Sequence, residues 1–268
     1  PDSTGPTPGM HFEGVVLDLD GTVYRGGEPI PGAPETVGRL RERGCSLLFC
    51  SNNPTKDRAA YVERLAGMGI TATADEVLSA GTVTTQYLRD HHADDRLYVV
   101  GASGLREQFA AADLHTTDDP EACEALVVSF YRGFDYDSIA DAYDAGRDGC
   151  PFIGTDPDVL IPTADGMAPG SGAMIRAVAG VLERDPDHVL GKPAPETVGM
   201  AREAIGVPLD RCLMVGDRLD TDIALGERAG MTTALVRTGV DGDGAVGGGD
   251  VTPDHVLDSV ADVERLFD

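Results

Sequence analysis

The chain has 268 residues and a formal net charge of −25, and 41% of its residues are apolar. The apolar content excludes an acidic disordered chain, and the length suffices for a large domain or for a domain with an insertion. The negative charge disfavours nucleic acid and anionic membranes as partners, because the long-range field repels both.

Short apolar runs alternate with longer helical patterns, which predicts an α/β fold with a parallel sheet and crossover helices. In chain order we predict a strand at 15–17, a helix at 35–43, a strand at 45–50 and a helix at 56–68. A different set follows, with strands at 97–100, 125–130 and 151–154 and helices between them. The alternation of strands and helices seen at 15–68 then resumes, with a helix at 196–205, a strand at 212–215, a helix at 221–229 and a strand at 233–236. We expect an exposed loop at 239–250 and a final short helix at 260–267.

Composition also bears on location. No basic, apolar signal segment opens the sequence and no apolar run reaches membrane-spanning length, so we expect a cytoplasmic protein.

Five widely spaced cysteines without a CxxC pair predict reduced, mostly buried thiols and no zinc site. Only two lysines occur, Lys56 and Lys192, among 21 basic residues. This acidic, lysine-poor composition is typical of a folded protein from a high-salt cytoplasm.

Two carboxylates follow the first predicted strand, in the sequence Asp18-Leu19-Asp20-Gly21-Thr22. Open parallel sheets bind ligands at the carboxyl edge of their strands, so both acids would enter that crevice. A lone pair of acids often only faces water, but Gly21 and Thr22 permit the tight exit that a strand-end site needs. With Mg²⁺ the pair can supply a phosphoryl-accepting nucleophile and a proton shuttle.

Two further motifs are suited to phosphate. Ser51-Asn52-Asn53-Pro54 follows the strand at 45–50, and its hydroxyl and backbone N–H groups form an anion site or, more commonly, a helix cap. Gly191-Lys192-Pro193 keeps one of the two lysines just ahead of a helix. A lone lysine usually lies on the surface, but here its ammonium group can neutralise a phosphorylated carboxylate.

A cluster of three acids follows the strand at 212–215, in the sequence Gly216-Asp217-Arg218-Leu219-Asp220-Thr221-Asp222. These carboxylates would repel one another unless they shared a cation, and their oxygens suit Mg²⁺. The alternative interpretation is an acidic helix start favoured by the helix dipole.

The four motifs in this order resemble the haloacid dehalogenase (HAD) superfamily. Room for a complete α/β cap between Ser51 and Lys192, together with Thr155-Asp156-Pro157-Asp158, resembles its NagD, 4-nitrophenylphosphatase and phosphoglycolate phosphatase branch. The family usually has Asn where this chain has Asp156, which puts cap contacts to substrate in doubt. The resemblance implies a Rossmann-like doubly wound parallel sheet core at 11–80 and 189–268. It also implies an α/β cap domain inserted at 81–188. From their Pro-, Thr- and Gly-rich composition, residues 1–10 are expected to form a flexible tail.

The resemblance also implies roles for site residues. Asp18 becomes the aspartyl-phosphate, and Asp20 protonates the leaving alkoxide and then deprotonates the attacking water. Lys192 bridges the phosphate and Asp18. The phosphoryl oxygens are held by Ser51 and by the backbone of Asn52 and Asn53.

Mg²⁺ is the cofactor that the resemblance implies. Asp18 and the backbone carbonyl of Asp20 would hold it, with Asp217 as a direct ligand. Asp222 binds the metal or supports a ligand.

We therefore predict a Mg²⁺-dependent phosphomonoesterase acting on a small phosphorylated metabolite, with no nucleic acid or membrane partner. The sequence leaves the oligomeric state open, and a homodimer formed through the cap would fit the family. A phosphotransferase or phosphomutase on the same core is an alternative, as is a non-catalytic sensor of phosphate esters. The intact acids and Lys192 argue against the sensor, because sensing needs no proton shuttle.

Other patterns favour simpler interpretations. Pro193 after Lys192 excludes the phosphate-binding loop of P-loop NTPases, and Gly170-Ser171-Gly172 is predicted to open a helix. His91 and His92 indicate an exposed helix end rather than a metal site. Tyr131, Arg132 and Phe134 follow a predicted strand and are weak candidates for substrate contacts.

Overall fold

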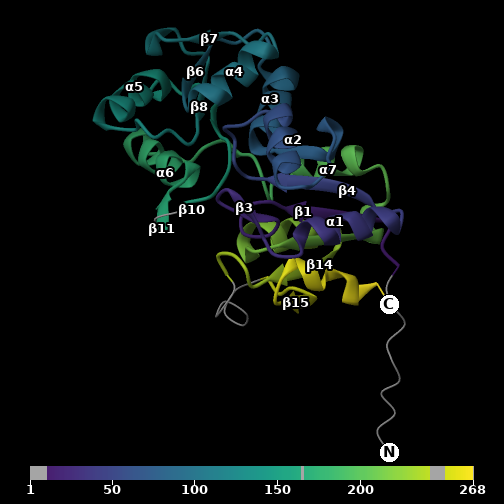
Figure 1. The fold of residues 1–268 in the computed structure, drawn as a ribbon. Coiled ribbons are helices and arrows are strands. Elements are labelled where there is room, and N and C mark those ends of the chain that lie inside the picture. The colour runs from purple at the N-terminus through teal and green to yellow at the C-terminus, as the bar shows by residue number, and fades with distance from the viewer. Residues whose placement is uncertain (1–10, 164–165, 242–250, 268) are drawn as a thin grey trace, which may run out of the picture.

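The computed structural model describes residues 11–163, 166–241 and 251–267 (Figure 1). Its main sheet has six strands in the order β15-β14-β13-β1-β4-β5, and every neighbouring pair is parallel. The strands are β1 (Gly14–Asp18), β4 (Ser46–Ser51), β5 (Val77–Ser79), β13 (Cys212–Gly216), β14 (Thr232–Val236) and β15 (His255–Leu257).

The order of these strands reverses at β1. From β1 the chain adds β4 and β5 on one side, and it later adds β13, β14 and β15 on the other. A doubly wound sheet opens a crevice at the carboxyl ends of its strands at such a reversal. The predicted fold class is confirmed, and Asp18 is the last residue of the strand at the reversal.

Alternation along β1 explains why both faces of this sheet are covered. Val15 and Leu17 belong to one apolar cluster and Val16 to another, because successive side chains of a strand point to opposite faces. On the first face the cluster includes residues of α1 (Ala33–Glu42), α2 (Arg58–Gly67) and the 3₁₀ helix η5 (Val260–Leu266). On the second face it includes residues of α3 (Ala80–His91), α7 (Pro195–Ile205) and α8 (Ala224–Ala229).

A second sheet of five parallel strands has the order β12-β9-β8-β6-β7. It comprises β6 (Leu97–Val100), β7 (Thr116–Thr117), β8 (Ala125–Val128), β9 (Phe152–Gly154) and β12 (His188–Val189). One of its faces shares an apolar cluster with α3 and α7 and packs on α4 (Ser103–Ala111). The other packs on α5 (Tyr136–Gly146) and α6 (Ser171–Leu182). Figure 1 shows this part as the teal and green upper-left half of the molecule.

Short elements complete the fold. Two hairpins are formed by β2 (Tyr24–Arg25) with β3 (Glu28–Pro29) and by β10 (Leu160–Thr163) with β11 (Gly166–Pro169). The remaining 3₁₀ helices are η1 (Ala74–Glu76), η2 (Pro120–Ala122) and η3 (Leu209–Arg211), and η4 (Leu219–Ile223) is a π-helix. Within the described ranges, no helix has the length and apolar character needed to cross a membrane.

Several predicted elements differ in detail from the structure. The predicted helix at 221–229 is split into η4 and α8, and the predicted final helix is 3₁₀ rather than α. The predicted strand at 125–130 ends at Val128. The predicted tail at 1–10 and most of the predicted loop at 239–250 lie outside the described residues.

Candidate active site

The crevice at the carboxyl edge of the main sheet gathers side chains from neighbouring strands. Asp18 ends β1, Ser51 ends β4 and Asp217 directly follows β13. Because β13, β1 and β4 are adjacent and parallel, these three residues emerge at the same edge. Lys192 reaches this edge from the loop after β12.

Lys192 is the central cation of the site. Its side chain is 2% exposed, and Nζ lies 2.6 Å from Asp18 Oδ1 and 2.7 Å from Asp222 Oδ1. Nζ also donates to the Cys50 carbonyl at 2.9 Å. Burial alone would lower the pKa of Lys192, but the charges of Asp18 and Asp222 outweigh it and raise that pKa well above its usual value. The two carboxylates therefore favour the charged form of Lys192.

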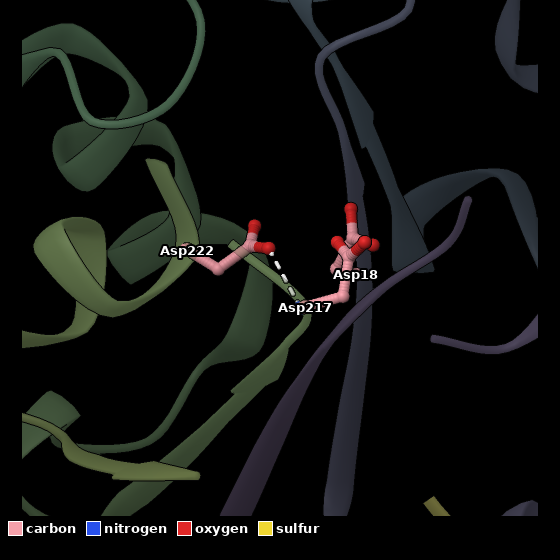
Figure 2. Close-up of side chains that lie close together, drawn as sticks. All are labelled: Asp18, Asp217 and Asp222. Atoms are coloured by element: carbon pink, nitrogen blue, oxygen red, sulfur yellow. Dashed lines mark hydrogen bonds between the residues drawn. The ribbon is translucent and has the colours of Figure 1, made fainter. Parts of the chain in front are cut away.

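Asp18, Asp217 and Asp222 form a buried acidic cluster in which one ligand atom of each lies within 4.8 Å of the others. Figure 2 shows their carboxylates converging from β1 and from the segment after β13. Burial and the charge of Asp222 raise the pKa of Asp18 well above its usual value. The same two causes raise the pKa of Asp217 to about 7.

Backbone groups hold two of these carboxylates in place. Asp222 Oδ2 accepts hydrogen bonds from the N–H groups of Asp217 and Arg218, each at 3.1 Å. Asp217 Oδ2 accepts from the Val240 N–H at 2.7 Å. The π-helix η4 directs Asp222 back toward the end of β13, and π-turns of this kind are frequent at functional sites.

The cluster fits a divalent cation. Three buried carboxylates face one ammonium group, and Asp18 Oδ2 has no hydrogen-bond partner among the described residues. A buried carboxylate oxygen without a partner is costly, and a hard cation such as Mg²⁺ prefers oxygen ligands of this type. The Asp20 side chain is outside the cluster, so its part in metal binding stays a prediction about its backbone carbonyl.

The backbone after β1 has room for glycine only. Gly21 has φ +96°, and a Cβ atom there would lie 2.4 Å from Asp217 Oδ2. Glycine therefore allows the chain to leave the strand sharply while Asp217 stays against it.

Asp20 lies beside this turn and, like Asp18, lines the cavity of the site. Its Oδ2 accepts from the Tyr24 hydroxyl at 3.4 Å. The Arg64 guanidinium carbon lies 4.2 Å from the centre of the Tyr24 ring. Burial raises the pKa of Asp20, and Arg64 partly offsets that effect.

The three predicted phosphate-binding residues have different hydrogen bonds. Ser51 Oγ accepts from the Asn53 N–H at 3.1 Å and from the Tyr61 hydroxyl at 3.3 Å. The Asn52 amide bonds the backbone N–H and carbonyl of Lys192 at 2.7 and 3.2 Å, so its side chain fixes the lysine loop. Asn53 Oδ1 accepts from the N–H and hydroxyl of Thr55 in a local turn. The side chains of both asparagines and the backbone N–H of Asn53 are thus bonded within the protein, and the phosphate contacts of this backbone stay a prediction.

A cavity of about 200 Å³ lies over these groups. Its floor comes from the main sheet, and its far wall includes Phe130, Asp156, Asp158, Ile161 and Ser171 from segments around the second sheet. The predicted contacts Tyr131, Arg132 and Phe134 instead line a neighbouring cavity of about 380 Å³ that shares Phe130 and Ile161 with the first.

Sequence reasoning assigned no role to Asp158 or Arg218, although both stand inside the quoted motifs. Asp158 Oδ1 accepts from the Asn52 amide at 3.3 Å and lies 3.6 Å from the Arg218 guanidinium. Arg218 also donates to the Leu160 carbonyl at 3.1 Å. These contacts join the segment after β9 to the acidic cluster. The sequence feature that could have indicated them is the opposite charge of Asp158 and Arg218.

Comparisons with known proteins agree with this geometry. A family model described as haloacid dehalogenase-like hydrolase matches residues 15–115, and a HAD-hydrolase-like model matches residues 189–263. The sugar-phosphatase AraL of Bacillus subtilis is 34% identical over 94% of this chain and 92% of that protein. The chain belongs to the haloacid dehalogenase-like hydrolases.

Solved structures place this hydrolase more closely within the family. The p-nitrophenyl phosphatase from Archaeoglobus fulgidus superposes with a TM-score of 0.89 and 32% identity, covering 95% of this chain and 99% of that one. NagD from Escherichia coli K-12 superposes with a TM-score of 0.83 and 26% identity, covering 94% and 98%. The protein is therefore a HAD-type phosphatase of the NagD-like branch.

Proposed function

We propose that this phosphatase is a Mg²⁺-dependent phosphomonoesterase that acts through an aspartyl-phosphate on Asp18. The observation that carries the proposal is the setting of the Asp18 carboxylate. One of its oxygens contacts Lys192 at 2.6 Å, and the other is buried without a partner among the described residues. The carboxylate lines the cavity beside two further acids. A nucleophile for phosphoryl transfer needs this combination of positioning and neighbouring charge.

Asp18, Asp217 and Asp222 are the side chains that would hold Mg²⁺, together with the backbone carbonyl of Asp20. When bound, the ion relieves repulsion between the carboxylates and a dianionic phosphate and stabilises charge on the transferring group. The chain's own contribution is to fix these acids on β1, on the end of β13 and on η4.

The remaining steps use side chains that line the same cavity. An Asp18 carboxylate oxygen attacks phosphorus, and Asp20 gives a proton to the departing alkoxide oxygen. Asp20 then takes a proton from water as that water attacks the aspartyl-phosphate, which releases phosphate and restores Asp18. Lys192 and Ser51 face the phosphoryl oxygens, where the ammonium group offsets their charge.

The cavity favours small phosphate esters as substrates. Its volume is about 200 Å³, and side chains around the second sheet close it on the side away from the main sheet. Macromolecular phosphate esters would need this wall to be absent. A sugar phosphatase and p-nitrophenyl phosphatases are among the similar proteins, which supports a small phosphorylated metabolite as the substrate class.

The wider organisation belongs to the same proposal. Residues 81–188 would form the cap domain over a core of residues 11–80 and 189–268, with a homodimer formed through the cap. The net charge of −25 and the two lysines support a high-salt cytoplasm as the setting. Sedimentation of the purified protein in concentrated KCl tests the dimer.

Phosphate release tests the function. The purified protein is assayed in concentrated KCl with 4-nitrophenyl phosphate and a panel of sugar phosphates, with Mg²⁺ or with a chelator. We expect Mg²⁺-dependent release that Asp18→Asn abolishes and that Asp118→Asn retains, because the Asp118 side chain is fully exposed. Equal release by the parent protein and Asp18→Asn, or transfer of the phosphoryl group without net release, would contradict the proposal.

A second readout separates metal binding from turnover. Mg²⁺ should raise the melting temperature of the parent protein, because a ligand that binds only the folded state stabilises it. The increase should disappear in Asp217→Asn and persist in Asp118→Asn. If Mg²⁺ raised the melting temperature of Asp217→Asn as much as that of the parent protein, Asp217 would not belong to the proposed metal site.

A further inference from the structure

Two of the five cysteines lie next to each other, at the end of the second sheet where its strands begin. Cys123 comes two residues before β8, and Cys150 comes two residues before β9. Because β8 and β9 are adjacent and parallel, the two side chains meet, and their Sγ atoms are 3.7 Å apart. Neither cysteine is fully buried.

The other three cysteines have different surroundings. Cys45, Cys50 and Cys212 are buried, with exposed fractions of 8%, 1% and 0%. Burial raises the pKa of the Cys50 thiol to about 12, so it stays protonated and unreactive. The prediction of reduced, mostly buried thiols agrees with the structure, in which all five cysteines are free and these three are buried.

Cys150 is the more nucleophilic member of the pair. The hydrogen bond with Cys123 and the nearby Arg184 guanidinium lower the pKa of Cys150 to about 7, while burial acts in the opposite direction. Arg184 is held there because it donates to the Cys150 carbonyl at 2.6 Å and to Asp187 at 3.2 Å. The same contact raises the pKa of Cys123. Either sulfur can be the donor in it, and Cys150 Sγ also donates to the Ala145 carbonyl at 3.3 Å. A half-buried thiol with a lowered pKa beside a second thiol is the arrangement of a reactive cysteine with its resolving partner.

We propose that Cys123 and Cys150 form a reversible disulfide by exchange with a low-molecular-weight disulfide. The Cys150 thiolate attacks one sulfur of that disulfide, which forms a mixed disulfide and releases one small thiolate. The Cys123 sulfur then attacks Cys150 Sγ and releases the second small thiolate. The two small thiolates take up the two protons that the protein thiols lose. Two cysteines are oxidised and one small disulfide is reduced to two thiols.

The geometry requires a small movement only. A disulfide bond is about 2.05 Å long, so the sulfur atoms must approach by roughly 1.7 Å, which rotation of the two side chains can supply. Both cysteines lie in loops rather than inside strands, so no ladder hydrogen bond has to break.

The bond would constrain a segment that contributes to the cavity. Residues 124–149 lie between the two cysteines and include β8, α5 and Phe130, which lines the cavity wall. Cross-linking the ends of such a segment removes conformational freedom from the unfolded chain and should raise the melting temperature by about 5 °C. The cysteines themselves are at the opposite end of β8 and β9 from the cavity.

Mass spectrometry of the full-length protein tests the proposal. After incubation with oxidised glutathione, the parent protein should lose the mass of two hydrogens, and digestion should give a cross-linked pair of peptides containing Cys123 and Cys150. Dithiothreitol should restore the original mass and reverse the increase in melting temperature. Separate glutathione adducts on the two cysteines, a cross-link that uses another cysteine, or no reaction would each overturn the proposal.

Single substitutions separate the two roles. Cys123→Ser should accumulate a glutathione adduct on Cys150, because no second thiol resolves it. Cys150→Ser should react far more slowly, because Cys123 lacks the Arg184 contact. Faster reaction of Cys150→Ser than of Cys123→Ser would refute the assignment of Cys150 as the attacking thiol. Phosphatase activity of the reduced variants serves as a check of folding, since neither cysteine lines the cavity.

Discussion

Asp156 should make the stability of the fold depend on pH. This carboxyl is 1% exposed and accepts hydrogen bonds from the Thr155 hydroxyl at 3.0 Å and from the Asp158 N–H at 3.2 Å. Burial and the charge of Asp158 raise its pKa from 3.8 to about 8. The folded protein therefore holds a proton here that the unfolded chain releases above about pH 4. Stability from this group is fully present below pH 4 and is lost as the pH rises toward 8.

The substitution Asp156→Asn removes this dependence while it keeps the shape of the protonated side chain. Each pH unit between the two pKa values changes the free energy of unfolding by at most about 1.4 kcal/mol. Relative to the parent protein, the variant should gain about 2 to 3 kcal/mol between pH 5 and pH 7. The gain should level off above pH 8. The change also restores the asparagine that the resembled family usually carries at this place.

Urea unfolding at fixed KCl concentration, repeated at each pH unit from 5 to 9, measures this difference. The informative quantity is variant minus parent, because titrating groups that do not interact with Asp156 cancel in it. Asp118→Asn is the matched control, since it makes the same change at a fully exposed side chain outside the cavity. A flat difference for Asp156→Asn, or one that falls with pH, would refute the reasoning.

Three other substitutions probe the site. Lys192→Arg should lower kcat/KM by about 100-fold despite keeping the charge, because a planar guanidinium cannot reproduce the ammonium contacts; steady-state kinetics measures it. Gly21→Ala should destabilise the fold by about 2 kcal/mol or more in urea unfolding, since the new Cβ would meet Asp217 at a positive φ. Tyr61→Phe should cost about 1 kcal/mol in the same assay, through loss of the hydroxyl that donates to Ser51 and to the Asn53 carbonyl. Parent-like values would contradict each of these.

The fold class could be predicted because periodicity and strand-end motifs are local features. The apolar run at 15–17 predicted a buried strand, and both of its faces are in fact covered. Because the carboxyl ends of parallel strands meet at one edge, the same reasoning predicted that Asp18, Ser51 and Asp217 would lie together, and the structure brings them together. Helix type at 219–229 was not predictable in this way, since the π-turn depends on Asp222 reaching the N–H groups at the end of β13.

Contacts between distant segments had no local signal. The pairing of Asp158 with Arg218 depends on how the segment after β9 lies over the main sheet. Likewise, Cys123 and Cys150 are 27 positions apart and meet only because β8 and β9 pair in parallel. Such contacts follow from the register of a sheet, which the sequence of either strand alone does not determine.

The position of Lys192 explains why one lysine remains buried in a chain that otherwise uses arginine. Replacing lysine with arginine changes the hydration of a side chain mainly where that side chain is in water. Lys192 is only 2% exposed, so such a replacement would change its hydration little. Its compact ammonium group meets three oxygens at 2.6, 2.7 and 2.9 Å. A guanidinium group spreads its charge over a plane and would displace Asp222 from the backbone N–H groups that hold it. The position is therefore constrained by geometry rather than by net charge, and this constraint sets it apart from the many exposed arginines.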